Sequence, residues 1–112
     1  MNLKTKGSAN NIAMANYNVK KHLRCCAVNV NSICNVKRRY DLQSFLNRNN
    51  IDIALISETK LNHRHKVSIQ NYDAIRNDRQ SAQRGGGTAI IIRNDIRYYM
   101  GYQLTIVGLI RS

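Results

Sequence analysis

One glutamate and two asparagines are the residues of this chain whose types and spacing are suited to chemistry. Glu58 is the single glutamate among 112 residues, and it directly follows the apolar run 51–57. A carboxylate at a strand end can hold a hard cation, and Mg²⁺ needs only one or two such ligands besides phosphates. Asn29 and Asn31 lie two residues apart near the end of another apolar run, so in a strand both carboxamides would point the same way. They could bind a phosphate oxygen or a metal-bound water, although turn formation by asparagine and a plain strand exit at Glu58 would explain the same residues.

The elements that would position these residues follow from hydrophobic patterning. Residues 23–31 (LRCCAVNVN) are apolar and rich in Cys and Val, which predicts a buried strand. Residues 36–48 place apolar side chains at helical spacing, and residues 51–57 (IDIALIS) are typical of a strand buried on both faces. Strand, helix and strand within about 35 residues make one crossover unit. The fold class is therefore α/β, and Asn29 and Glu58 are expected at one edge of the sheet.

Caps, turns and further apolar runs mark the remaining elements. Asn35 is expected to cap the helix, and the asparagines at 49–50 to end it, because Asn tolerates left-handed geometry. Residues 72–75 predict a short strand, residues 88–93 (TAIIIR) a strong one, and residues 96–110 one or two more. A mixed β-sheet with the helix packed outside it is the expected arrangement.

The balance of charge indicates a polyanionic partner. Eighteen Lys and Arg face six Asp and Glu, which gives a net charge of +12 at pH 7. Charge of this size favours nucleic acid and speeds association with it, although a need for solubility would explain it as well. Residues 1–22 are rich in Asn and Lys and have no apolar period, so we expect a flexible basic tail there and one domain over residues 23–112.

The composition excludes several classes of protein. The cysteines, Cys25, Cys26 and Cys34, are odd in number and lack CxxC spacing, so neither a disulfide framework nor a zinc module is expected. His63 and His65 could bind a transition metal, but a third ligand is not apparent and a polar loop is the better interpretation. No apolar run approaches the roughly 18 residues that a membrane span needs, and the N-terminus lacks the apolar core of a signal peptide. An intracellular, reducing setting is expected.

A glycine run and three arginines form a second candidate contact set. The glycines at 85–87 could approach a phosphate closely. They lack the lysine and spacing of a P-loop, so a hinge or a tight turn into the next strand is the favoured interpretation. Arg76, Arg79 and Arg84 flank this loop and are expected to contact a nucleic-acid backbone.

Two groups of motifs resemble one known family. VNVNSI followed by DIALISETKL resembles the first two motifs of the endonuclease/exonuclease/phosphatase superfamily. NYDAIRNDRQSAQRGGGTAIIIRNDI is similar to the third region of its branch in non-LTR retrotransposons, such as the jockey-like elements. The resemblance spans about residues 23–96, and SETKL followed by GGGTAI is its specific part. It implies a four-layer α/β sandwich, with two sheets and helices outside, that nicks DNA with Mg²⁺ beside a reverse transcriptase in the full-length element.

The resemblance also assigns roles to single residues. Asn29 matches the first active-site asparagine, near the scissile phosphate, and Glu58 matches the metal-binding glutamate; both would be catalytic. Asn31 matches the second polar position of the first motif, as a further metal ligand, and Lys60 matches a basic position that can meet the DNA backbone. DNA bound with weak sequence preference, Mg²⁺ without a small-molecule cofactor, and a nuclear location are the consequent expectations.

Departures from the family pattern limit what the chain is expected to do. Val28 replaces an aromatic residue, Cys34 a basic residue and Asn71 a glycine. The family's later motifs, with a tyrosine, an Asp/Asn pair and an Asp–His pair that include the acid–base machinery, are absent from the sequence up to Ser112. The chain would then be an N-terminal part of the domain and inactive alone. The alternatives are a non-catalytic basic fragment that binds nucleic acid and a non-functional relic of a mobile element.

Overall fold

The computed structural model describes residues 22–78 and 85–109, which belong to two compact units. The larger unit, Leu23–Arg93, holds a four-stranded sheet and one helix, and the unit that includes Asn94–Ser112 holds a two-stranded sheet. The protein is therefore a mixed α/β protein, as the sequence predicted. The tail expected over residues 1–22 lies outside the described residues, apart from its last residue.

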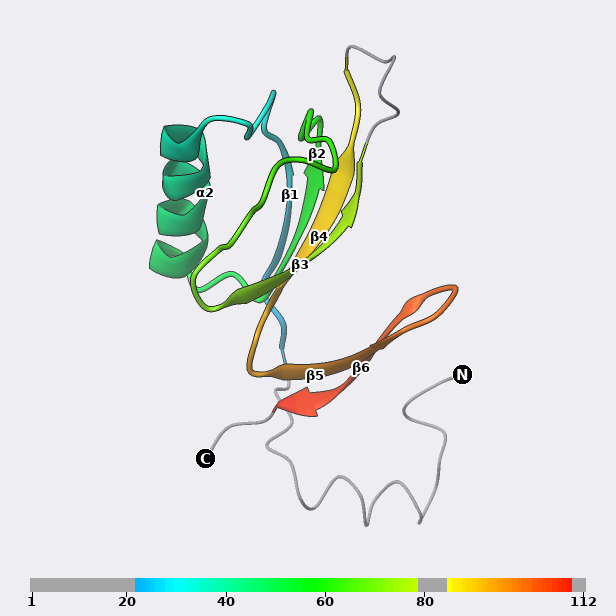
Figure 1. Ribbon diagram of the computed structural model, residues 1–112. Coiled ribbons are helices and arrows are strands. Elements are labelled where there is room, and N and C mark those ends of the chain that lie inside the picture. The colour runs from blue at the N-terminus through cyan, green and yellow to red at the C-terminus, as the bar shows by residue number, and fades with distance from the viewer. Residues whose placement is uncertain (1–21, 79–84, 110–112) are drawn as a thin grey trace, which may run out of the picture. The chain divides into compact units, whose positions relative to one another are not determined.

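A strand, a helix and a second strand open the larger unit (Figure 1). They are β1 (Cys25–Asn29), α2 (Val36–Arg48) and β2 (Ile53–Ser57). The two strands pair in parallel, and at the end of the ladder Asn29 lies opposite Ser57. The predicted crossover unit is thereby confirmed, and the ends of both strands arrive at the same edge of the sheet.

Two further strands complete the sheet, and one of them is antiparallel to both strands beside it. β4 (Thr88–Arg93) lies between β2 and β3 (Tyr72–Asn77), so that the order is β1-β2-β4-β3, and β4 is antiparallel to both neighbours. Thr88, the first residue of β4, is opposite Ser57 on one side and Asn77 on the other. The segment that precedes β4 therefore reaches the same edge as the segment that follows β2.

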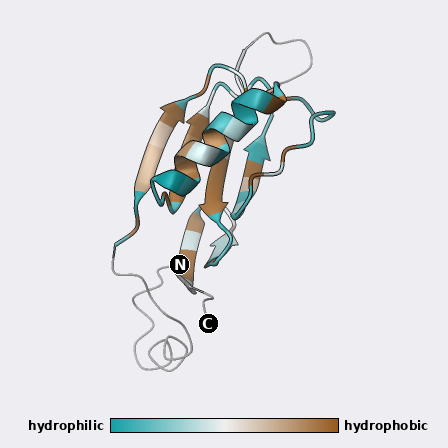
Figure 2. Cartoon of the chain, turned by 90° about the vertical axis from the view of Figure 1, so that its left-hand side faces the viewer, coloured by the Kyte–Doolittle hydropathy of each residue, from teal (hydrophilic) through white to brown (hydrophobic). Residues whose placement is uncertain are grey.

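Helix α2 lies across one face of this sheet, and Figure 2 shows its largely polar outer side in front of mainly apolar strands. The Asn35 side chain accepts a hydrogen bond from the Lys37 amide at 2.7 Å, which confirms the expected cap. Leu42 and Leu46 are the buried residues of α2, and they belong to the apolar core between the helix and the sheet. No helix in the described part of the chain combines the length and apolar character that a membrane crossing requires.

An apolar core lies between α2 and the sheet. Its buried members are Ile33, Leu42, Leu46, Ile51, Ala54, Ile56, Leu61, Ile69, Tyr72, Ala89 and Ile91. The Tyr72 hydroxyl lies 2.9 Å from the carbonyl oxygen of Leu46 and 2.6 Å from that of Ile51. This buried hydroxyl joins the end of α2 and the approach to β2 to the start of β3, so the core fixes the crossover against the rest of the sheet.

The described part of the smaller unit is a hairpin. β5 (Ile96–Met100) and β6 (Leu104–Leu109) pair in antiparallel fashion, with an irregularity in register between Arg97 and Tyr98. Residues 101–103 connect the strands. The expectation of one or two strands over residues 96–110 is confirmed.

Candidate functional site

The ends of β1 and β2 continue side by side into two loops. Beyond the last strand pair, the amide of Val30 donates to the carbonyl oxygen of Ser57 at 3.1 Å, and the amide of Ser32 donates to that of Glu58 at 2.7 Å. Asn29, Asn31 and Glu58 therefore stand along one edge of the sheet, on neighbouring segments of backbone. The crossover unit thus places the two asparagines and the glutamate, whose types indicated chemistry, on neighbouring backbone segments.

The backbone of these loops is unusual for residues that carry side chains. Asn31 has a φ of 47°, Ser32 of 88°, Glu58 of 57° and Lys60 of 58°. Asn visits this left-handed region readily, whereas for other L-residues it costs about 1 kcal/mol or more. Such conformations persist where the surrounding structure holds them, and they cluster at functional sites. The strain therefore falls on Ser32, Glu58 and Lys60, of which the last two carry charged side chains.

The glycine run lies against Glu58. A carboxylate oxygen of Glu58 accepts a hydrogen bond from the Gly86 amide at 3.3 Å. The backbone runs alongside as well, because the Lys60 amide donates to the Gly86 carbonyl oxygen at 2.9 Å and the Thr59 amide to that of Gly87 at 3.1 Å. Gly86 and Gly87 have φ values of 88° and 87°, which favour glycine. The run makes a tight turn into β4, as expected, and it also lies directly against the Glu58 carboxylate.

Gly85 matters for space rather than for conformation. A Cβ atom at this position would lie 3.2 Å from Glu58 Oε1, closer than side chains ordinarily approach. A side chain here would press on the carboxylate. Sequence analysis missed this contact between the glycine run and the glutamate; the repeated glycines were the signal.

Lys60 is held by the asparagines of the first loop. Its ammonium donates to Asn31 Oδ1 at 2.8 Å, and the Asn31 amide in turn donates to Asn29 Oδ1 at 3.1 Å. A divalent cation on the same Asn31 oxygen would meet repulsion from the ammonium. This arrangement favours Asn31 as the residue that positions Lys60 over its expected role as a metal ligand.

Two arginines near the start of α2 donate hydrogen bonds to the loop that follows β1. The Arg38 guanidinium donates to the carbonyl oxygens of Ser32, at 2.9 Å, and of Val30, and Arg39 Nη1 donates to those of Ile33 and Cys34 at 2.9 and 2.8 Å. Charge-assisted bonds of this kind restrain the loop that carries Asn31. The helical spacing of residues 36–48 did not predict these supports, because they depend on the path of the loop that precedes the helix.

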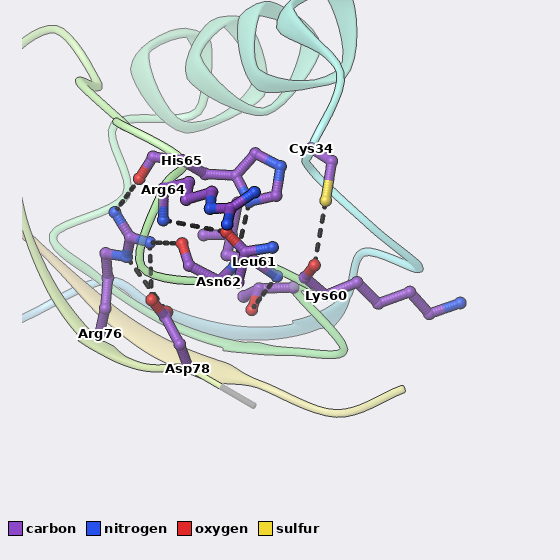
Figure 3. Close-up of polar contacts among 9 residues, drawn as sticks. Cys34, Lys60, Leu61, Asn62, Arg64, His65, Arg76 and Asp78 are labelled. Carbon is purple, nitrogen blue, oxygen red and sulfur yellow. Dashed lines mark hydrogen bonds and ion pairs between the residues drawn. The ribbon is translucent and has the colours of Figure 1, made fainter. Parts of the chain in front are cut away.

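A second cluster fixes the segment after Lys60 (Figure 3). The Cys34 thiol donates to the Lys60 carbonyl oxygen at 3.0 Å, while the Lys60 side chain extends away from the cluster. Arg76 reaches the carbonyl oxygens of His65 and Asn62 at 2.7 and 3.0 Å, and it pairs with both carboxylate oxygens of Asp78 at 2.7 and 3.2 Å. The guanidinium of Arg76 is thus engaged inside the chain, which favours a structural role over the expected contact with DNA.

The other residues expected to bind nucleic acid or metal have different outcomes. Arg79 and Arg84 lie outside the described residues. His65 Nδ1 accepts a hydrogen bond from the Asn62 amide at 3.0 Å, so its ring closes the loop of which it is part. Within residues 22–78 and 85–109, no group of three or more His, Cys, Asp or Glu side chains could hold a metal ion. His63 and His65 lie in a segment without helix or strand, as the interpretation of a polar loop expected.

The residues at the sheet edge fit Mg²⁺ better than a transition metal. Mg²⁺ retains several waters and takes one or two carboxylates together with phosphate oxygens, whereas zinc needs at least three nitrogen, sulfur or carboxylate ligands from the protein. Glu58 offers one carboxylate, half-buried and backed by the Gly86 amide. Asn29, exposed at the end of β1, adds a carboxamide on the neighbouring segment of backbone. A carboxylate, a carboxamide and the Lys60 ammonium suit a phosphate ester and its counter-ion.

Comparison with known proteins identifies no family. No protein-family model matches the chain, and no curated protein matches it significantly.

Proposed function

We propose that the chain is part of a Mg²⁺-dependent phosphodiesterase domain similar to the DNA-nicking endonucleases of non-LTR retrotransposons. The observation that carries the proposal is the position of Asn29, Glu58 and Lys60 at one edge of the sheet, with the glycine run behind the carboxylate. The proposal entails a four-layer α/β sandwich, in which the larger unit would supply one sheet and its covering helix. It also entails DNA as the partner and a nuclear location.

Each residue of the edge has a task in this proposal. Glu58 holds the cation, and the Gly86 amide keeps its carboxylate in place. Bound there, Mg²⁺ would supply charge stabilisation on the scissile phosphate. Lys60, oriented by Asn31, neutralises the DNA backbone beside it. Asn29 contributes a carboxamide to the phosphate, on the segment next to Glu58.

A second function, nucleic-acid binding without cleavage, is favoured by one specific observation. Eighteen basic residues against six acidic ones attract a polyanion whether or not the edge is catalytic. The two functions differ in what Mg²⁺ does. In the phosphodiesterase, Glu58 would hold Mg²⁺, whose charge would strengthen the binding of DNA, whereas for a purely basic surface Mg²⁺ competes with the protein and weakens binding.

The test compares DNA affinity with Mg²⁺ and with EDTA at constant ionic strength. Wild type is expected to bind duplex DNA several-fold more tightly with Mg²⁺, and Glu58→Gln is expected to lose that gain. Asp73→Asn is the matched control, because it removes one exposed carboxylate from the opposite end of the sheet. Weaker binding of wild type in Mg²⁺, or an equal gain in Glu58→Gln, would leave the basic binding fragment as the better account.

A further inference from the structure

Two tyrosines stand exposed at the end of the β5–β6 hairpin. Tyr99 is 62% exposed, and Tyr102 is fully exposed. Three of the six tyrosines of the chain fall within residues 98–102. Single exposed apolar residues are ordinary on protein surfaces, but aromatic rings that gather at one exposed place indicate an interaction site. The turn end of the hairpin therefore presents two aromatic side chains that are exposed in the described part of the chain.

The two rings border one hollow. Tyr99, Gly101, Tyr102, Gln103 and Thr105 line a space of about 670 Å³. A Cβ atom at Gly101 would lie 3.3 Å from Tyr99 Cε2 and 3.5 Å from its hydroxyl oxygen. The Gly101 amide donates to the Gln103 carbonyl oxygen at 3.1 Å, which closes the turn. The turn thus leaves room for the Tyr99 ring because its residue 101 has no side chain.

We propose that Tyr99 and Tyr102 form a stacking site for unpaired bases of single-stranded nucleic acid. A flat aromatic ring stacks on any base, and proteins that bind single strands combine such rings with positive charge along the backbone. Charge supports this partner, since the chain carries +12 and residues 96–109 contain Arg97 but no Asp or Glu. Gln103 and Thr105 are polar residues in the lining of the same hollow.

This site is independent of the proposed phosphodiesterase. Stacking needs neither Mg²⁺ nor Glu58, so it is measured in EDTA. Failure of the hairpin to stack bases would leave the chemistry at the sheet edge untouched, and failure of the Mg²⁺ experiment would leave the hairpin site untouched.

The test separates bases from phosphates. The full chain is titrated into a fluorescent oligothymidylate and into an abasic oligomer of the same length and charge. Wild type is expected to bind the oligothymidylate about fivefold or more tightly than the abasic strand, as stacking on one ring predicts. Tyr102→Leu should remove most of that preference while binding to the abasic strand stays unchanged.

Two further variants test whether the preference depends on the rings of the hairpin. Gly101→Ala keeps both tyrosines but displaces the Tyr99 ring, so it should also reduce the preference. Tyr40→Leu, on the outer side of α2 and as exposed as Tyr99 at 62%, should leave it intact. The proposal is overturned if wild type binds both strands equally, if Tyr40→Leu matches Tyr102→Leu, or if Tyr102→Leu retains the preference, which would leave a protein partner as the better explanation of the rings.

Discussion

The Glu58 carboxylate and the Gly86 amide, 28 residues apart in sequence, are joined by a hydrogen bond of 3.3 Å. The bond exists because β4 lies beside β2 in antiparallel orientation, which brings the segment before β4 next to the segment after β2. A glycine segment is thereby the support of the residue proposed to hold the cation. The two neighbouring glycines should respond differently to substitution.

Gly86→Ala and Gly85→Ala separate backbone strain from crowding of the carboxylate. Gly86 has a φ of 88°, so alanine there should lower the free energy of unfolding by about 1–2 kcal/mol. Gly85 is not at positive φ, and its new Cβ would meet Glu58 Oε1 at 3.2 Å. Gly85→Ala should therefore change unfolding in urea little, yet reduce the gain in DNA affinity from Mg²⁺ several-fold. Equal stability of the two variants would contradict this assignment.

Lys60 is expected to contribute one phosphate contact. Binding of DNA to a chain with +12 net charge should weaken steeply with salt, because counter-ions are released on binding. Lys60→Met should reduce the slope of log affinity against log salt by about one. Lys37→Met is the control, since Lys37 is exposed on α2 and paired with Asp41 at 3.3 Å. If both variants change the slope equally, Lys60 contributes no more to the contact with DNA than an ordinary surface lysine does.

Arg76 is expected to matter for stability and not for DNA affinity. Its four hydrogen bonds within the chain join β3 to the 62–65 loop and to Asp78, and its side chain is 22% exposed. Arg76→Lys cannot reproduce this fork and should lower the free energy of unfolding by about 1–3 kcal/mol. Urea unfolding measures this change. A salt slope reduced as in Lys60→Met, with stability unchanged, would instead restore the DNA contact that the sequence indicated.

Sequence analysis located the crossover unit because its signals are local. Two continuous apolar runs, helical spacing between them and the cap at Asn35 each depend on residues a few positions apart. Parallel pairing of the two runs then determines that Asn29 and Glu58 share an edge. No contact beyond the crossover had to be known.

The support of the site could not be predicted in this way, because it comes from long-range contacts. The position of β4 between β2 and β3 decides that the glycines meet Glu58, and the path of the 62–65 loop decides that Arg76 points inward. Neither is encoded by spacing in the sequence. Likewise, the family resemblance assigned Asn31 to a metal and Lys60 to the DNA backbone, and spacing in the sequence could not show that the two side chains share a hydrogen bond of 2.8 Å.

The chain alone is expected to bind DNA without cutting it. In the proposed function, Glu58, Asn29 and Lys60 would hold a phosphodiester and a cation, but a carboxylate that binds a cation is a poor base, and hydrolysis also needs groups that orient water and stabilise the leaving oxygen. Catalytic geometry tolerates little looseness, so a site with only part of its groups gains little rate. Supercoiled plasmid incubated with Mg²⁺ should show equal background nicking with wild type and with Glu58→Ala. Nicking by wild type that disappears in Glu58→Ala would mean that this chain, alone or as a dimer, completes the site with groups not identified at the sheet edge.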